Sequence, residues 1–177
     1  MAFMSVLMVL GFLAIIMAII LAIAVLMYVF TGIGLSKIAK KLGEENSWLA
    51  WIPVANSYLV GKLGCNVKTG IFLAVASPVS GIISGIMNIM IQNQPVDLLN
   101  NDVIAIAFWM VIIALSLLSI ALSITMLVFY LIAVYHIYEK FSKEAVIMTV
   151  FTALSAGILS PVFLFAIRNH EVRKEYT

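Results

Sequence analysis

Long apolar stretches alternate with short charged ones along this chain. Asp, Glu, Lys and Arg are all missing from residues 1–36, 69–96, 103–138 and 145–167. About 20 helical residues cross a hydrocarbon core of about 30 Å, and each stretch exceeds that length. The pattern predicts an all-α integral membrane protein, a single domain over residues 1–177 with spans at about 3–30, 70–91, 107–133 and 145–167. The first three are expected as long helices. The fourth is broken, because Ser155-Ala-Gly157 and Ser160-Pro161 interrupt it.

The first helix is expected to continue beyond the membrane. Apolar residues at positions 35, 38, 39 and 42 fall on one helical face, and Lys37, Lys40 and Lys41 lie on the other. Lysines at headgroup level attract anionic lipid by about 1 kcal/mol each. They also act as topology signals without a specific partner, and we favour this simpler interpretation. Gly43 is the expected C-cap of the helix.

Residues 48–61 form the most distinctive local sequence. Trp48, Trp51 and Tyr58 are amphipathic aromatic residues of the kind that settle at a membrane–water boundary. The segment is too short to cross a membrane, and we expect Pro53 to kink it. We therefore predict an interfacial or shallow re-entrant helix. It either docks a partner protein or anchors the chain, and the density of aromatic side chains favours docking.

The second and third spans carry small residues suited to helix packing. Ser77, Gly81 and Gly85 recur every four residues, a small-xxx-small pattern that lets another helix approach closely. In the third span, one face carries Ser116, Ser119 and Ser123, and we expect these serines to face the glycines. The third apolar stretch would reach about 54 Å as one helix, so it must protrude, tilt or break.

The distribution of lysines predicts the topology. Five lysines lie between the first and second spans, whereas the loop at residues 92–102 has two aspartates and no lysine. The positive-inside rule then places the lysine-rich link in the cytoplasm, and it places the N-terminus and the 92–102 loop outside. The last stretch conflicts with this rule, because both of its flanks are basic.

A weak internal repeat offers a solution to the conflict. Residues 38–49 match residues 137–148 at an offset of 99, and in each copy a basic helix end precedes a proline-containing apolar stretch. If the copies are equivalent, residues 145–167 form a re-entrant pair of half-helices and the tail stays cytoplasmic. If they are not, the stretch crosses and the tail lies outside. The sequence slightly favours four spans and leaves both interpretations open.

Candidate chemistry is sparse. His136 is the one histidine in the third apolar stretch, and an intramembrane histidine is a functional candidate by default. It lies near the end of that stretch, where a structural hydrogen bond is the simpler interpretation. The sequence has no carboxylate pair in its apolar stretches, no Ser–His–Asp arrangement and no phosphate-binding loop, and it has one cysteine, Cys65. We therefore expect no enzyme activity, no metal site and no cofactor. A net charge of +2 does not suggest nucleic acid.

Two segments resemble a group of small multi-pass membrane proteins of Gram-positive bacteria. The segments are residues 37–62, with the sequence KIAKKLGEENSWLAWIPVANSYLVGK, and residues 161–169, with the sequence PVFLFAIRN. The resemblance implies a bacterial plasma-membrane location. The group has no established activity, so the resemblance assigns no functional residue.

The sequence supports two classes of function. The first is a small non-enzymatic membrane subunit of a transport or cell-envelope complex. It would assemble with itself or with another membrane protein through the Gly81/Gly85 face, or through the aromatic segment. The second is a small transporter or substrate-binding component for a neutral or amphiphilic ligand, because broken helices at a repeat interface are typical of transporter sites.

Overall fold

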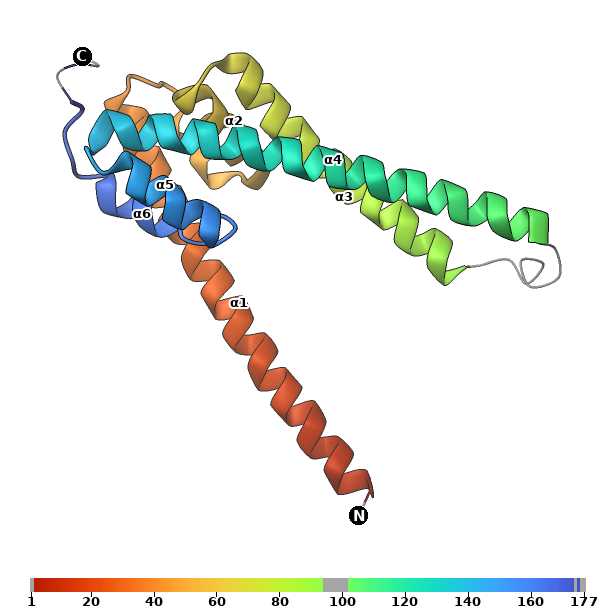
Figure 1. The fold of residues 1–177 in the computed structure, drawn as a ribbon. Helices are drawn as coiled ribbons and strands as arrows, with labels where there is room; N and C mark the ends of the chain where they lie inside the picture. The colour runs from red at the N-terminus through yellow and green to blue at the C-terminus, as the bar shows by residue number, and fades with distance from the viewer. Residues whose placement is uncertain (1, 94–101, 174, 176–177) are drawn as a thin grey trace.

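The computed structural model describes residues 2–93, 102–173 and 175. Every regular element in this part of the chain is a helix. Three helices are long and apolar enough to cross a membrane: α1 (Ala2–Lys41), α3 (Val67–Gln92) and α4 (Asp102–Phe141). The protein is thus an all-α membrane protein, as the apolar pattern predicts (Figure 1).

The third predicted span forms one unbroken helix. Its 40 residues measure about 60 Å, twice the thickness of the hydrocarbon core. Transmembrane helices tilt by about 20° on average, which accounts for little of the excess. Helix α4 therefore protrudes. Pro78 lies inside α3 without ending it.

Four shorter helical elements complete the fold. They are the 3-10 helix η1 (Ser47–Trp51) and the α-helices α2 (Pro53–Gly64), α5 (Ala145–Leu154) and α6 (Ser160–Ile167). Helix α5 is about 15 Å long and α6 is shorter, so neither crosses a membrane. Between them the chain turns at Ala156 (φ 51°) and Gly157 (φ 87°), both in the left-handed region. Residues 145–167 thus form two short helices joined by a turn. This arrangement fits the re-entrant interpretation, and the stretch contains no single helix long enough to cross as the four-span interpretation predicts.

The C-terminal tail returns to the end of the molecule where α1 and α4 finish. The Arg173 amide donates a hydrogen bond to the Lys140 carbonyl at 2.9 Å. The Lys41 ammonium donates to the His170 carbonyl at 2.7 Å. The basic tail and both basic helix ends thus lie together, which removes the conflict between the two flanks of the last apolar stretch.

The hydrophobic core lies at this charged end, whereas the long helices separate away from it. Figure 1 shows α1 diverging from the paired α3 and α4, so that the molecule is V-shaped with its core at the vertex. The described side chains of α1 from residue 8 to residue 26 are exposed. Fully buried residues begin farther along, where the amphipathic pattern was predicted, and include Leu35, Ile38 and Ala39.

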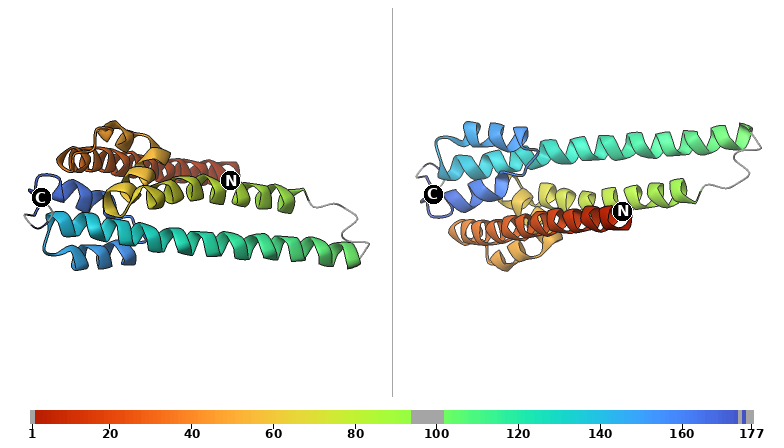
Figure 2. Two further views of the ribbon diagram at one scale, coloured as in Figure 1. Left: turned by 90° about the horizontal axis from the view of Figure 1, so that it is seen from above. Right: turned by 90° about the horizontal axis from the view of Figure 1, so that it is seen from below.

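The two matching segments occupy equivalent places in this core. At the offset of 99, Leu35, Ile38 and Ala39 correspond to Val134, Ile137 and Tyr138, and all six side chains have zero exposure. Helix α1 packs against η1 and α6, whereas α4 packs against α5 and α2. Helices α1 and α4 therefore each pack against one short element of their own half and one from the other half. Figure 2 shows α5 and α6 on different sides of α4.

Close backbone approaches follow the same symmetry. A Cβ atom added to Gly34 in α1 would lie 2.8 Å from the Leu164 carbonyl carbon in α6. A Cβ atom at Gly64 in α2 would overlap the carbonyl oxygen of Ala133 in α4, and Ala133 is the equivalent of Gly34. The lysines repeat the pattern, since Lys140 donates to the Leu63 carbonyl at 2.7 Å as Lys41 donates to His170. Helices α1 and α4 run in the same direction and end at the same charged end of the molecule. The two halves that they begin therefore form a parallel repeat.

Helix ends mostly follow the sequence signals. Gly43 has φ +77°, and the Glu44 amide donates to the Ala39 carbonyl at 2.9 Å, which closes the end of α1 as a glycine C-cap does. Pro53 starts α2 at its first turn and does not kink a continuous helix. Of the loop predicted at residues 92–102, residues 94–101 lie outside the described residues.

Candidate functional site

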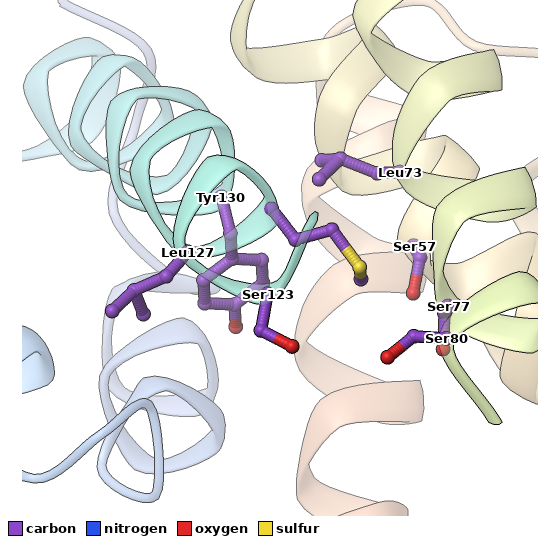
Figure 3. A pocket seen from close by; sticks show the side chains of 8 residues that line it. Ser57, Leu73, Ser77, Ser80, Ser123, Leu127 and Tyr130 are labelled. Carbon is purple, nitrogen blue, oxygen red and sulfur yellow. The ribbon is translucent and has the colours of Figure 1, made fainter. Parts of the chain in front are cut away.

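An open cavity of about 330 Å³ lies between α2, α3 and α4. Figure 3 shows Ser57, Ser77 and Ser80 on one side of it, opposite Ser123 and Tyr130. Apolar side chains complete the lining, which consists of Ser57, Leu73, Ser77, Ser80, Ser123, Met126, Leu127 and Tyr130. Hydroxyl groups from three helices thus converge in a region where the sequence is otherwise apolar.

Glycine contacts bring the first wall of the cavity into place. A Cβ atom at Gly61 would lie 2.6 Å from the Cα atom of Gly70, so α2 and α3 touch through their backbones. Ser57 is one helical turn before Gly61 and on the same face of α2. Asn66 caps α3, since its Oδ1 atom accepts a hydrogen bond from the Thr69 amide at 2.9 Å. This fixed start of α3 sets the rotation that presents Ser77 and Ser80 to α4.

Tyr130 connects the cavity to the re-entrant pair. Its hydroxyl donates to the Ser160 Oγ atom at 2.7 Å, and Ser160 is fully buried at the start of α6. Farther along α4, the hydroxyls of Tyr138 and Thr152 lie 3.3 Å apart. Buried hydroxyls need such partners, because an unpaired one costs about 1–3 kcal/mol. These two contacts therefore fix α5 and α6 relative to α4.

The lining limits the chemistry of a ligand. None of the lining residues carries a formal charge, and no carboxylate or histidine is available among them for acid–base chemistry. Ser77 and Ser123 are exposed side chains within helices long enough to cross a membrane. Hydrocarbon offers a hydroxyl no hydrogen bond, so these groups favour a polar occupant without net charge. The apolar part of the lining, including Met126 and Leu127, favours an amphiphile.

The serines predicted for packing do face α3, but the glycines do not meet them. Ser116, Ser119 and Ser123 line cavities along the seam between α3 and α4. A Cβ atom at Gly81 or Gly85 would meet nothing within 4 Å. The expected contact of these glycines with α4 is therefore wrong for this chain, because the serines of α3 occupy the facing positions. Contact of the Gly81/Gly85 face with another chain stays a prediction.

The predicted docking residues divide between two environments. The Trp51 ring covers Gly32, where an added Cβ atom would lie 2.7 Å from the ring. The Tyr28 hydroxyl also donates to the Trp51 carbonyl, so Trp51 joins η1 to α1. Trp48 is 58% exposed and free to meet lipid or a partner. Tyr58 is partly buried, and the Lys62 ammonium lies 5.9 Å from its ring centre.

The lysines predicted to contact lipid lie at the surface. Lys37, Lys40 and Lys41 are exposed. Lys62 instead pairs with Glu44, with 2.7 Å between Nζ and Oε2. The hydrogen bond with Glu44 raises the pKa of Lys62 above its usual value of 10.5. This pair joins the end of α1 to α2.

His136 lies beside the single cysteine. Its Nδ1 atom is 3.7 Å from the Cys65 Sγ atom, and its ring meets the Tyr135 ring edge-on. Burial raises the pKa of the Cys65 thiol above 9.0, so the reactive thiolate is disfavoured. Within the described part of the chain, no three His, Cys, Asp or Glu side chains are grouped to hold a metal ion. The pair is thus consistent with a structural contact.

Comparison of the chain with protein families, with curated proteins and with solved structures found no match. The functional argument therefore rests on the residues and their geometry.

Proposed function

We propose that this protein is a non-enzymatic membrane protein that binds a neutral, amphiphilic ligand within the bilayer, as a small transporter or substrate-binding component does. The observation that carries the proposal is the convergence of Ser57, Ser77, Ser80, Ser123 and Tyr130 on one open cavity. Ligand sites are typically concave and largely apolar with a few convergent polar groups, and this cavity has that composition.

The location proposed for the protein is a bacterial plasma membrane. The resemblance of residues 37–62 and 161–169 to Gram-positive membrane proteins supports this location. The grouping of the basic helix ends with the tail supports an orientation in which the charged end is cytoplasmic.

The cavity proposal is tested by ligand retention. Purified protein in mild detergent is analysed by native mass spectrometry for co-purifying lipid or other amphiphiles. We expect Ser80→Leu and Ser123→Leu, which fill the cavity, to reduce the bound fraction about tenfold, or about 1.4 kcal/mol in affinity. Ala121→Leu is the matched control, because Ala121 is exposed on α4, the helix of Ser123, and is not part of the cavity lining. Equal retention by all variants would exclude the cavity as the site.

A second candidate function is a subunit that assembles with a partner. The observation that favours it is the long exposed part of α1, whose described side chains from residue 8 to residue 26 are all exposed. Cysteines introduced at Ala18 or Ala22 would be cross-linked in membranes. A discrete cross-linked species of stable stoichiometry would support the subunit function, whereas labelling by lipid probes alone would show that this helix faces lipid.

A further inference from the structure

A second cavity continues the first along the seam between α3 and α4. It has a volume of about 310 Å³, and its polar lining comes from Ser84, Asn88, Ser116 and Ser119. Ser84 is four residues beyond Ser80 on α3, and Ser119 is four residues before Ser123 on the antiparallel α4. The two cavities are therefore adjacent, one helical turn apart on both helices.

Together the cavities form a polar furrow through the membrane-spanning part of the molecule. The polar residues of α3 are Ser77, Ser80, Ser84 and Asn88, spaced by three or four residues on one helical face. On α4 the polar lining extends from Ser116 to Tyr130, which corresponds to about 21 Å at 1.5 Å per residue. The furrow thus covers about two thirds of a hydrocarbon core about 30 Å thick.

The furrow is open along its side. Ser77, Ser84, Asn88 and Ser123 are exposed, although their helices are otherwise coated with apolar side chains. A hydroxyl that faces hydrocarbon without a hydrogen-bond partner costs free energy, and the hydroxyls of Ser77 and Ser84 have no partner among the described residues. A row of them along one seam is stabilised when a polar group occupies the seam.

The hydrogen-bonding capacity of the furrow suits a headgroup. The hydroxyls of Ser116 and Ser123 donate to the carbonyls of Ile112 and Ser119 at 2.7 and 2.8 Å. The hydroxyls of Ser80, Ser84 and Ser119 have no partner among the described residues, so they can donate to the phosphate oxygens of a headgroup. Asn88 donates one hydrogen bond to the Ser84 carbonyl at 2.9 Å, and its second amide N–H can donate to a phosphate oxygen. Since no lining residue of either cavity is charged, the furrow has no fixed charge that would hold an ion.

We propose that this furrow carries the headgroup of a zwitterionic phospholipid from one leaflet to the other, while the acyl chains remain in the surrounding bilayer. The lateral opening is the reason to choose a phospholipid over a soluble solute, because a solute needs an enclosed path and a lipid needs an open side. The movement is passive and occurs in both directions. This inference rests on the proposed function, to which it adds the ligand class and the path.

The test is a lipid-scrambling assay on the full chain. Vesicles of phosphatidylcholine with a trace of headgroup-labelled fluorescent phosphatidylcholine are reconstituted with the protein. Membrane-impermeant dithionite is then added, and it reduces only label in the outer leaflet. We expect wild-type protein to give access to the inner-leaflet label, whereas protein-free vesicles retain it. A wild-type trace equal to that of protein-free vesicles would overturn the proposal.

Variants between the two cavities distinguish translocation from binding. Ser84→Leu and Ser119→Leu obstruct the second cavity and leave the lining of the first unchanged. We expect both to slow scrambling about tenfold and to retain lipid in native mass spectrometry, with Ala121→Leu as the unaffected control. Wild-type scrambling rates in both variants would refute the furrow as the path.

A soluble fluorophore enclosed in the same vesicles controls for leakage. Its protection from dithionite is expected, and its reduction would overturn the lipid path in favour of a solute pore. If the wild-type protein retains bound lipid but does not scramble it, only this inference is contradicted. If the wild-type protein neither scrambles lipid nor retains any bound lipid, the proposed function is contradicted too.

Discussion

The contact between Gly64 and Ala133 should be the point in the core least tolerant of added volume. A Cβ atom at Gly64 would overlap the Ala133 carbonyl oxygen and would lie 2.5 Å from the Ala133 Cα atom. Both neighbours are backbone atoms of α4, which cannot rotate away as a side chain can. Gly64→Ala therefore requires α2 and α4 to separate.

The expected loss follows from overpacking. Adding a methyl group to a tightly packed site costs about 1–3 kcal/mol and occasionally more. Alanine is a better helix former than glycine by up to about 1 kcal/mol, which offsets part of this cost. For a chain of this size, each kcal/mol corresponds to about 2–4 °C in Tm. We expect Gly64→Ala to lower Tm by several degrees.

Thermal unfolding in detergent checks this expectation with a control in the same chain. Gly85→Ala makes the same chemical change in α3, where the added atom meets nothing within 4 Å, so its Tm should stay the same or rise slightly. Gly34→Ala, at the equivalent contact with α6, should lower Tm as Gly64→Ala does. If Gly64→Ala and Gly85→Ala melt at the same temperature, the close α2–α4 contact and the reasoning built on it are incorrect.

Three further predictions concern topology, hydrogen bonding and pH. In a Cys65→Ser background, single cysteines that replace Glu45 and His170 should be protected from an impermeant maleimide in intact cells, while a cysteine that replaces Asn93 is labelled. If the cysteine at position 170 is labelled while the one at position 45 is protected, the two ends lie on different sides of the membrane and the re-entrant pair is contradicted. Tyr130→Phe and Ser160→Ala should each destabilise the protein by about 1–3 kcal/mol, because each leaves a hydroxyl unpaired, and the double variant should cost less than their sum; strict additivity would mean that the hydroxyls do not interact. Because burial raises the pKa of Cys65, the pH at which its alkylation by iodoacetamide reaches half the maximal rate should be higher than for a small free thiol. The thiolate is the disfavoured form in the folded protein, so stability should also fall as pH rises above 9.0, and a thiol that reacts like a free one would contradict this.

The apolar pattern predicts the three long helices because both the affinity of a segment for lipid and its length can be read directly from the sequence. It also predicts the amphipathic end of α1, since Leu35, Ile38 and Ala39 recur at helical spacing and are buried. The serine face of α4 is predicted by the same spacing. What faces those serines is not, because the rotation of α3 depends on the Asn66 cap and on the contact between Gly61 and Gly70.

The glycines show why contacts are harder to predict than helices. Gly81 and Gly85 match a packing motif, yet a Cβ atom added to either would meet no described residue within 4 Å. Gly34 and Gly64 match no such motif and lie directly against the backbone of another helix. The repeat offered a signal for the second pair, since Gly34 corresponds to Ala133 at the offset of 99, and both are small. Both interpretations of residues 145–167 stay open at the level of sequence, because hydrophobicity alone cannot distinguish one crossing helix from two short helices that bend at Ala156 and Gly157.

The exchange of short helices between the two halves has a consequence for how the chain is made. Lys41 and the carbonyl that it binds are 129 residues apart, so the first helix is synthesised long before its packing partner α6 exists. At about 5–20 residues per second, ribosomes need roughly 6–26 s to supply that partner. During this interval the amphipathic end of α1 can pack against η1, which follows it directly in the chain, but the face that α6 covers stays open. Maturation of this small protein therefore cannot finish before its last helix is released from the ribosome.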